Sequence, residues 1–479
     1  MRALGFILCL FSLFSCISCK SRGSATGGPQ DVRKLVILTA NNDSIVKEFT
    51  WGFQQYCARQ FDQKVEIERR DVGGGSSSIE SFIFDTYNNI DRDKLPRPED
   101  YSCDIDIVWG GGDAMYDRLA ASSTRNPDGL LEKLDLPPEV IAQIGSPGAD
   151  APNMFGGLPF YHKDLLWVGS TVSSFGFLCN SGMMARCGLR VPSLWEDVAD
   201  ARYTDLVTLA DPSQSGSVLR SYHLIVQSAP TWKEGWEALL KVLSNAKRFS
   251  DSAGAAANAP VLGDCLVASC IDFYGLMRVA EAPDQLRYVN PEAQTTYGSD
   301  PIGILKNPPH RQLAQQFVRF VMSARGQALW VLPPGVKDGP IRAALGRLPI
   351  RRDVFALYED NIPRGINFYE SKQLMTVSAE VAGVDTNVLK FLVTSAAVEN
   401  VDSMRRARKR LNQLAADGAR ADAYRRCLAE FNRLPDDVDS VAKMQAVSPM
   451  LKDDLGRYTV TRAWRDFFRD KFDRIAGEP

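Results

Sequence analysis

The sequence predicts an α/β protein with two lobes, followed by a C-terminal region that is largely helical. Three strand–turn–helix units follow one another within residues 31–113, and the same alternation returns in residues 175–295. Strands that alternate with helices are typical of sheets that carry helices on both faces. From residue 353 onward, apolar residues recur at helical spacing instead. A chain of 479 residues is also too long for one ordinary core.

The N-terminus is expected to be a targeting segment that lies outside the fold. An apolar run over residues 3–14 follows a positively charged start and is too short to span a bilayer as a mature helix. Leu13-Phe14-Ser15-Cys16 resembles a bacterial lipobox, which predicts a lipoprotein signal peptide over residues 1–16 with Cys16 acylated. Cys19 is a second candidate. Residues 17–30, rich in Gly and Ser, would form a flexible tether to a membrane.

Each of the first three expected strands is followed by a turn rich in Gly, Ser or Asn; the strands are residues 35–39, 64–68 and 105–109. The first turn contains Asn41 and Asn42, and we expect Asp43 or Ser44 to cap the helix that follows. In parallel α/β sheets, ligands bind beyond the carboxyl ends of the strands. These turns are therefore candidates for one wall of a binding cleft.

The later part of the α/β region is expected to hold three further strands, at residues 206–210, 266–273 and 295–305, and a helix at residues 314–330. A turn of small residues separates the strand at 206–210 from a helix that begins near Ser217. Such a turn leaves backbone N–H groups unpaired at a helix N-terminus, and the free donors and the helix dipole both suit an anion. The alternative is a capped helix without a ligand.

Several motifs occur in one order along residues 31–352 and carry a resemblance to a known family. They are the run 176–180 that ends in Asn180, Pro192 with Trp195-Glu196-Asp197, Asp211-Pro212-Ser213 with Ser215-Gly216, and the runs 263–275, 300–309 and 314–330. With these motifs the chain closely resembles the extracellular solute-binding proteins of bacterial ABC importers, in the branch that includes the ferric-ion-binding proteins. The resemblance is weakest in residues 353–479.

The resemblance implies a two-lobed periplasmic-binding-protein fold of type II-like architecture, with a helical C-terminal extension. Lobe 1 would comprise residues 31–170 and 298–352, and lobe 2 residues 171–297. The strands that cross between the lobes would lie near residues 167–177 and 295–304. The extension, residues 353–479, is expected to wrap on the first lobe.

The candidate ligand contacts come from turns in both lobes. Lobe 2 would contribute the turn at Ser215, Gly216 and Ser217, which in the ferric-binding relatives holds an anion that accompanies the metal. The remaining candidates are Asn41, Asn42, Gly74, Gly75, Ser76, Ser77, Gly111, Gly112, Asp113 and Ser174. Glycine lets backbone approach a ligand closely, and serine supplies adaptable hydrogen bonds. The alternative for the glycine-rich turns is a flexible linker.

Asp272 and Tyr274 are the last two candidates, and they bear on the nature of the ligand. Iron-binding relatives carry a Tyr-Tyr pair where this chain has Phe273-Tyr274, because ferric ion prefers anionic oxygen ligands. They also often place a His in the turn that holds Asn41 and Asn42 here. One phenol without a His does not easily complete a ferric site. A sugar phosphate or another small polar anion fits at least as well, although simple strand packing would also explain the two aromatic residues.

Composition argues against several functional classes. The formal net charge of −2 lacks the basic footprint of a nucleic-acid binder, and only three His argue against a His-rich metal site. No G-x-S-x-G, H-E-x-x-H or P-loop motif occurs, so we expect neither an enzyme nor a cofactor. Ten Cys in an exported chain allow disulfides, for example Cys179 with Cys187 or Cys265 with Cys270. A basic cluster at residues 405–410 would be a solvated face or a contact to lipid or permease.

These observations together predict a monomeric lipoprotein outside the cytoplasm that captures a small anionic solute by hinge closure and delivers it to an ABC permease in the membrane. A ferric-ion-binding protein is the first alternative. A sensor that reports its ligand to a signalling receptor is the second.

Overall fold

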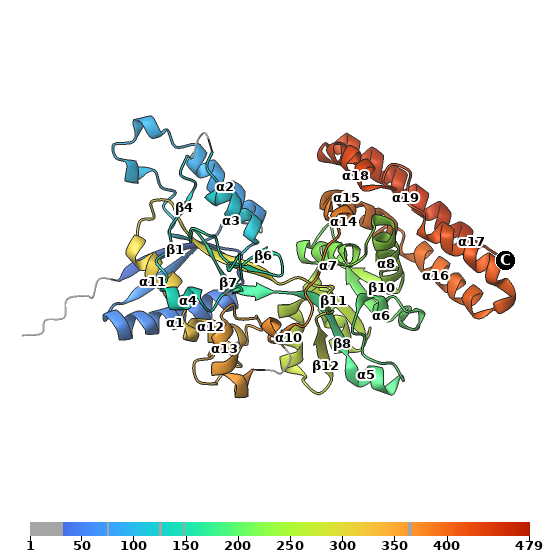
Figure 1. The fold of residues 1–479 in the computed structure, drawn as a ribbon, viewed down its shortest axis with the longest axis horizontal. Coiled ribbons are helices and arrows are strands. Elements are labelled where there is room, and N and C mark those ends of the chain that lie inside the picture. The colour runs from blue at the N-terminus through green and yellow to red at the C-terminus, as the bar shows by residue number, and fades with distance from the viewer. Residues whose placement is uncertain (1–31, 74–75, 124–126, 147–148, 363–365) are drawn as a thin grey trace, which may run out of the picture.

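The computed structural model describes residues 32–73, 76–123, 127–146, 149–362 and 366–479. Figure 1 shows two α/β lobes side by side, with a layer of helices along the outer side of the second lobe. The predicted signal peptide and tether, the predicted acylation site Cys16, and the candidate contacts Gly74 and Gly75 lie outside the described residues.

Lobe 1 is built on a mixed sheet. Its strands are β1 (Arg33–Thr39), β2 (Val65–Arg70), β3 (Ile107–Trp109), β4 (Leu131–Glu132), β7 (Val168–Ser173) and β13 (Gly298–Leu305). The order is β2-β1-β3-β13-β4, with β7 paired to β13. β1 runs parallel to β2 and β3, whereas β13 is antiparallel to its neighbours. A separate small hairpin joins β5 (Met154–Phe155) to β6 (Leu158–Pro159).

Helices cover both faces of this sheet. The helices of lobe 1 and its edge are α1 (Asp43–Phe61), α2 (Ser76–Asn88), α3 (Asp113–Ala120), α4 (Pro138–Ile141), α11 (Arg311–Val321), α12 (Ala324–Val331) and α13 (Arg352–Leu357). The core under α1, α11 and α12 includes Phe49, Phe317 and Trp330, and a second core lies under α2 and α3. The single helix expected at residues 314–330 is wrong, because Ser323 starts a new helix by accepting a hydrogen bond from the Gly326 N–H at 3.0 Å.

Lobe 2 has a five-stranded sheet of its own. The strands are β8 (Phe175–Asn180), β9 (Val207–Ala210), β10 (Ala246–Ser250), β11 (Val267–Ile271) and β12 (Leu286–Val289), in the order β10-β9-β11-β8-β12. The helices are α5 (Ser181–Arg186), α6 (Trp195–Val198), α7 (Gly216–Gln227), α8 (Trp232–Ser244), α9 (Ala253–Leu262) and α10 (Asp272–Glu281). The strand expected at residues 266–273 is too long, since Asp272 begins α10 and puts Phe273 and Tyr274 in the first helical turn.

The chain crosses between the lobes next to Ser174. β7 ends at Ser173 in the first sheet, and β8 begins at Phe175 in the second. The return crossing leads from β12 to β13, whose first residue, Gly298, pairs with Ser173. The two crossings therefore meet at one point between the sheets.

From α14 onward the C-terminal extension packs on lobe 2, so the expectation that it wraps on lobe 1 is wrong for these helices. Only the start of the extension, with Phe355 and Phe368, packs in the core of lobe 1. Its helices are α14 (Ala379–Ala382), α15 (Thr386–Val393), a π-helical turn (Thr394–Val398), α16 (Val401–Ala416), α17 (Ala421–Asn432), α18 (Val441–Val447) and α19 (Asp454–Ala476). They share one apolar core with lobe 2. Trp232 Nε1 donates to the Val438 carbonyl at 2.8 Å, and the rings of Trp236 and Phe468 lie 5.8 Å apart.

The physical reason lies in the wide apolar face of α8, which buries Trp232, Trp236, Leu239, Leu240, Val242 and Leu243 and leaves only a narrow polar stripe at Lys233, Glu237 and Lys241. An apolar face this wide needs cover beyond that given by lobe 2, and the extension supplies it. The basic cluster helps to dock the extension, because Arg405 and Lys409 both pair with Asp205 of lobe 2. Arg408 is buried and donates to the Ala199 carbonyl at 2.8 Å.

The described cysteines, seven in number, are all free thiols, so neither Cys179–Cys187 nor Cys265–Cys270 is formed as a disulfide. Within the described ranges, no helix combines the length and the apolar character needed to cross a bilayer.

The shared core predicts that the extension stabilises lobe 2. Phe468 is fully buried between Trp236 and Phe472, so Phe468→Ala should lower the free energy of unfolding by about 3–5 kcal/mol. Urea unfolding followed by tryptophan fluorescence measures this loss. Tyr458→Ala, on the same helix but 59% exposed, is the control and should change stability by no more than about 0.5 kcal/mol. A loss below about 1 kcal/mol for Phe468→Ala would contradict a shared core.

Candidate functional site

The turn between β9 and α7 forms an open helix N-terminus. Asp211 shapes it by accepting the Ser213 N–H at 2.8 Å, and Ser215 occupies the N-cap position of α7. The Ser215 side chain accepts no backbone N–H of the first turn among the described residues, and its Oγ lies 3.2 Å from Ser217 Oγ. Serine at this position usually binds a backbone N–H of the first turn. The turn therefore keeps its backbone donors and two hydroxyls together at the positive end of the helix dipole.

Arg220 lies one helical turn beyond Ser217, on the same face of α7, and is half-buried. Its Nη1 lies 3.2 Å from Gln227 Oε1, and its Nη2 donates to Thr296 Oγ1 at 3.3 Å, next to the crossing to lobe 1. Burial lowers the pKa of the Arg220 guanidinium, and the charge of Asp113 opposes this effect. Because Asp113 begins α3 of lobe 1, Arg220 and Asp113 face each other from different lobes. Sequence reasoning missed Arg220, although its spacing of three from Ser217 was a usable signal.

His223 keeps this part of α7 free of a second positive charge. Its ring is buried and lies 3.3 Å from Arg220 Nη1 through Nδ1, while Nε2 has no partner within the described chain. Burial and, secondly, the Arg220 charge lower the pKa of His223 to about 4. The ring is therefore neutral near pH 7. Of Arg220, His223 and Gln227, which lie along one face of α7, only Arg220 then carries a positive charge.

Two lobe 1 candidates, Asn41 and Asn42, differ in whether their side chains have hydrogen-bond partners. Asn41 is buried at the end of β1, and its Nδ2 has no acceptor among the described residues. Asn42, and not Asp43 or Ser44 as expected, caps α1 by accepting the Ile45 N–H at 3.1 Å. Ser76 and Ser77 are the first two residues of α2.

The glycine turn before α3 leads directly to Asp113. Gly110 and Gly111 both have positive φ, at 83° and 95°, which glycine adopts without strain, and Gly112 is the N-cap residue. A Cβ on Gly110 would lie only 3.1 Å from Asn41 Nδ2, so the turn stays close to the end of β1. Asp113 Oδ1 accepts the Ala114 N–H at 3.0 Å, and burial raises the pKa of the Asp113 carboxyl.

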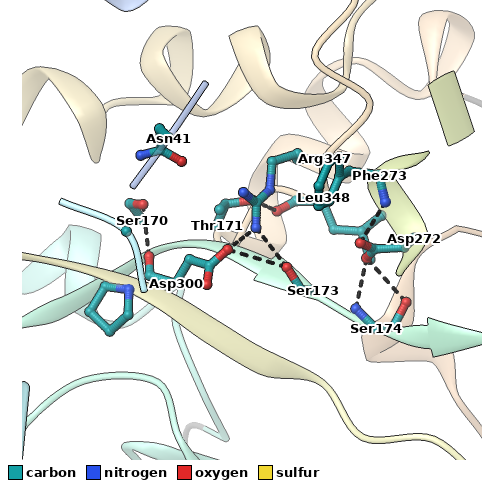
Figure 2. A network of polar contacts seen from close by, with 12 residues as sticks. Asn41, Ser170, Thr171, Ser173, Ser174, Asp272, Phe273, Asp300, Arg347 and Leu348 are labelled. Atoms are coloured by element: carbon teal, nitrogen blue, oxygen red, sulfur yellow. Dashed lines mark hydrogen bonds and ion pairs between the residues drawn. The ribbon is translucent and has the colours of Figure 1, made fainter. Parts of the chain in front are cut away.

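Ser174 and Asp272 hold each other at the crossing between the lobes. The Ser174 N–H donates to Asp272 Oδ2 at 2.8 Å, and Ser174 Oγ lies 3.1 Å from the same oxygen (Figure 2). The Phe273 N–H donates to the other carboxylate oxygen at 2.7 Å. Asp272 is fully buried, and burial raises its pKa to about 6. Both side chains are thus occupied by structural bonds.

Arg347 completes the polar network at the crossing, and sequence reasoning missed it as well. Its Nη2 binds Ser173 Oγ at 2.6 Å and pairs with the Asp300 carboxylate, so it ties β7 to β13 (Figure 2). Its charge also acts on Asp272, against the effect of burial. Tyr274 lies outside this network and packs on the start of α9, where a Cβ on Gly254 would approach its ring to 3.2 Å. In the described part of the chain, no three His, Cys, Asp or Glu side chains gather as a metal site would require.

The neutral state of His223 predicts a loss of stability at acid pH. Its pKa is about 4 in the folded protein and about 6.5 when unfolded, so the unfolded chain binds the proton more readily. Stability is therefore full above pH 6.5 and falls as the pH drops toward 4, by about 3 kcal/mol from this group. Chemical unfolding at several pH values should show a clearly shallower decline for His223→Gln. Equal declines in the two proteins would contradict this assignment.

Comparison with known proteins identifies the fold and finds a family model that matches part of the chain. The bacterial extracellular solute-binding protein family matches residues 148–333. The phosphoglycerate transport regulatory protein PgtC of Salmonella typhimurium is 27% identical over 166 residues, which are 34% of this chain and 40% of PgtC, so the match spans less than half of that relative.

Two solved structures are similar over most of their length. The spermidine/putrescine ABC transporter substrate-binding protein PotD of Streptococcus pneumoniae aligns with a TM-score of 0.50 and 16% identity, over 73% of this chain and 93% of PotD. The periplasmic binding protein AfuA of Actinobacillus pleuropneumoniae, with fructose-6-phosphate bound, aligns with a TM-score of 0.47 and 20% identity, over 72% of this chain and 91% of AfuA. Residues 148–333 thus match the bacterial extracellular solute-binding protein family, and the two α/β lobes have the fold of PotD.

Proposed function

We propose that this protein captures a small organic anion, such as a phosphorylated hydroxy acid or sugar, between its lobes and delivers it to an ABC permease. The observation that carries the proposal is the open N-terminus of α7 with Arg220 one turn behind it. Free N–H groups, two hydroxyls and a guanidinium are the donors that phosphate and carboxylate groups need.

The lobe 1 contacts would recognise the other end of the solute. Asp113 accepts hydrogen bonds and would bind a hydroxyl group, whereas the Asn41 amide has a free donor within the described chain. An anion at α7 would also compete with Asp113 for the Arg220 charge. Together with the glycine-rich turns at Gly111 and Gly112, these groups would enclose a polar solute when the lobes close.

The relative PgtC supports a phosphorylated solute, because its name assigns it to phosphoglycerate transport. A ferric ion with an accompanying anion ranks second. Tyr274 packs on α9 and Asp272 is taken up by Ser174, so neither side chain is free for a metal without rearrangement. We further propose that the protein acts as a monomer outside the cytoplasm, held at the membrane by a lipid on Cys16.

Native mass spectrometry of the purified chain, compared with its denatured mass, tests the solute class directly. Binding proteins with slow dissociation often keep their ligand through purification. Extra mass equal to an organic phosphate or a similar anion would support the proposal and name the solute. Extra mass equal to a single iron would overturn it in favour of a ferric-binding protein.

The two hydroxyls of the α7 turn should contribute to affinity. Ser215→Ala combined with Ser217→Ala should weaken binding of 3-phosphoglycerate, or of the anion that mass spectrometry identifies, by about 1–3 kcal/mol, since both hydroxyls would be buried partners. Isothermal titration calorimetry measures the change. Ser213→Ala is the control, because that exposed side chain lies before the helix in the same turn. Unchanged affinity of the double variant would move the site elsewhere.

Arg220 should matter more than either serine. Arg220→Gln should weaken binding of the same anion by about 1.5–3 kcal/mol, or roughly tenfold or more, because a charged donor is lost. The affinity of Arg220→Lys should lie between those of the unaltered protein and Arg220→Gln, since lysine keeps the charge but not the planar pair of donors. Arg186→Gln removes an equal charge from an exposed position of lobe 2 and should bind like the unaltered protein. Equal affinity of Arg220→Gln and Arg186→Gln would exclude Arg220 from the site.

A second function, as a ligand sensor, is favoured by the same relative, since PgtC is named as a regulatory protein. Uptake of the labelled solute and expression of the transport genes in a strain without this chain separate the two functions. Lost uptake with normal expression would support a transport receptor. Lost induction, with uptake restored by artificial expression of the permease, would support a sensor.

A further inference from the structure

A second hollow lies where the two lobes meet, apart from the proposed solute contacts. It is a groove of ≈ 430 Å³ between α10 and β12 of lobe 2 and the segment that follows α12 in lobe 1. Its walls are mostly apolar and include Leu276, Val279, Leu286, Val331, Pro333 and Ala344. None of Asn41, Asp113, Ser215, Ser217 or Arg220 lines it.

Arg347 brings an unsatisfied donor to this groove. The residue is 5% exposed and lines the groove, and its Nη2 is taken up by Ser173 and Asp300. Its Nε–H is buried and has no acceptor among the described residues. A buried donor without a partner is costly, and native proteins rarely leave one without a reason. An acceptor from a molecule in the groove would satisfy it after a small shift of the guanidinium, because Nε itself has almost no exposed surface.

A second arginine stands at the rim of the same groove. Arg287, on β12, is exposed and lines the groove from the lobe 2 side. No carboxylate pairs with it within the described ranges, whereas Arg278 nearby is held by Glu281. The groove thus combines apolar walls with one unpaired guanidinium and one orphan N–H. Tyr288, whose hydroxyl donates to the Cys270 carbonyl at 3.1 Å, closes its inner end.

We propose that this groove is a second binding site, for an amphipathic organic anion with an apolar body and one carboxylate, sulfonate or phosphate group. The volume is within the range of small-molecule sites, which are mainly apolar with a few placed polar groups. An adjoining hollow of ≈ 420 Å³ shares Leu276, Arg287, Tyr288 and Ile366 and would accept a longer apolar body. A hydroxylated phosphate, as proposed for the cleft, would gain nothing from these walls.

Because residues of both lobes line the groove, a ligand bound there would be sensitive to how the lobes are arranged. A ligand that contacts lobe 1 and lobe 2 together binds one lobe arrangement better than another. By linkage, it must then change the affinity for the solute, and the solute must change its affinity by the same factor.

The test uses two dyes with similar apolar bodies and the purified full chain. 8-Anilinonaphthalene-1-sulfonate carries a sulfonate, whereas N-phenyl-1-naphthylamine has no charge, and both fluoresce in apolar surroundings. We expect saturable binding of the sulfonate at one site, at least tenfold tighter than binding of the neutral dye. Arg287→Gln should weaken the sulfonate about tenfold and leave the neutral dye within twofold. Arg186→Gln is the control of equal charge and should match the unaltered protein.

Ala280→Trp gives an independent readout that leaves the arginines in place. Ala280 is exposed at the rim of the groove, so a Trp there should fill it and abolish saturable binding of both dyes. Unchanged sulfonate binding in Ala280→Trp would overturn the proposal, as would equal affinity of Arg287→Gln and Arg186→Gln. Complete, competitive displacement of the dye by 3-phosphoglycerate would also overturn it, since cleft and groove would then be one site.

Discussion

The point where the chain passes between its lobes is held by two carboxylates and one arginine. Asp272, at the start of α10, accepts the backbone N–H of Ser174, which lies between β7 and β8. Arg347 ties the end of β7 to Asp300 on the returning strand. These groups are largely buried, and a buried charge that loses its partner costs several kcal/mol. The network therefore holds the two crossing segments together and so sets how the two lobes are placed relative to each other.

The N-terminus of α7 differs from those of α1, α8 and α9 in how its first turn is capped. α1, α8 and α9 each use an N-cap side chain, from Asn42, Thr231 and Ser252, to satisfy the first turn. Ser215 at α7 has the right chemistry but, within the described chain, does not do so. At the crossing the carboxylates of Asp272 and Asp300 have their donors, whereas at the α7 turn, in the part of the chain described, the N-cap side chain leaves the first-turn N–H groups unsatisfied. These free donors are the basis of the anion site proposed here.

Much of the fold could be predicted from the sequence because it depends on local spacing. The strands near residues 35–39, 64–68 and 206–210, and the helix beginning near Ser217, are present within a few residues of their expected bounds. Errors occurred where a single side chain changes the backbone: Ser323 starts a new helix within an apolar run, and Asp272 ends a strand by opening a helix.

The side of the molecule on which the extension packs could not be read from its own sequence. The determining signal lies more than a hundred residues earlier, in the wide apolar face of α8, and only tertiary contact connects the two. Arg220 and Arg347 were missed for a related reason. Arginine is common on surfaces, and what distinguishes these two is burial and partners from the other lobe or the crossing strands.

The attachment of the helices from α14 to α19 to lobe 2 has a mechanical consequence. Its last helix, α19, has 23 residues and is therefore about 34 Å long, and its C-terminal end lies at the edge of the molecule farthest from lobe 1 (Figure 1). Lobe 2 and the extension share one core and rotate together. A small angular change at the crossing would be magnified at the tip of this long lever. Under the proposed capture by lobe closure, a bound solute would therefore displace the far end of α19, where a neighbouring molecule could contact it.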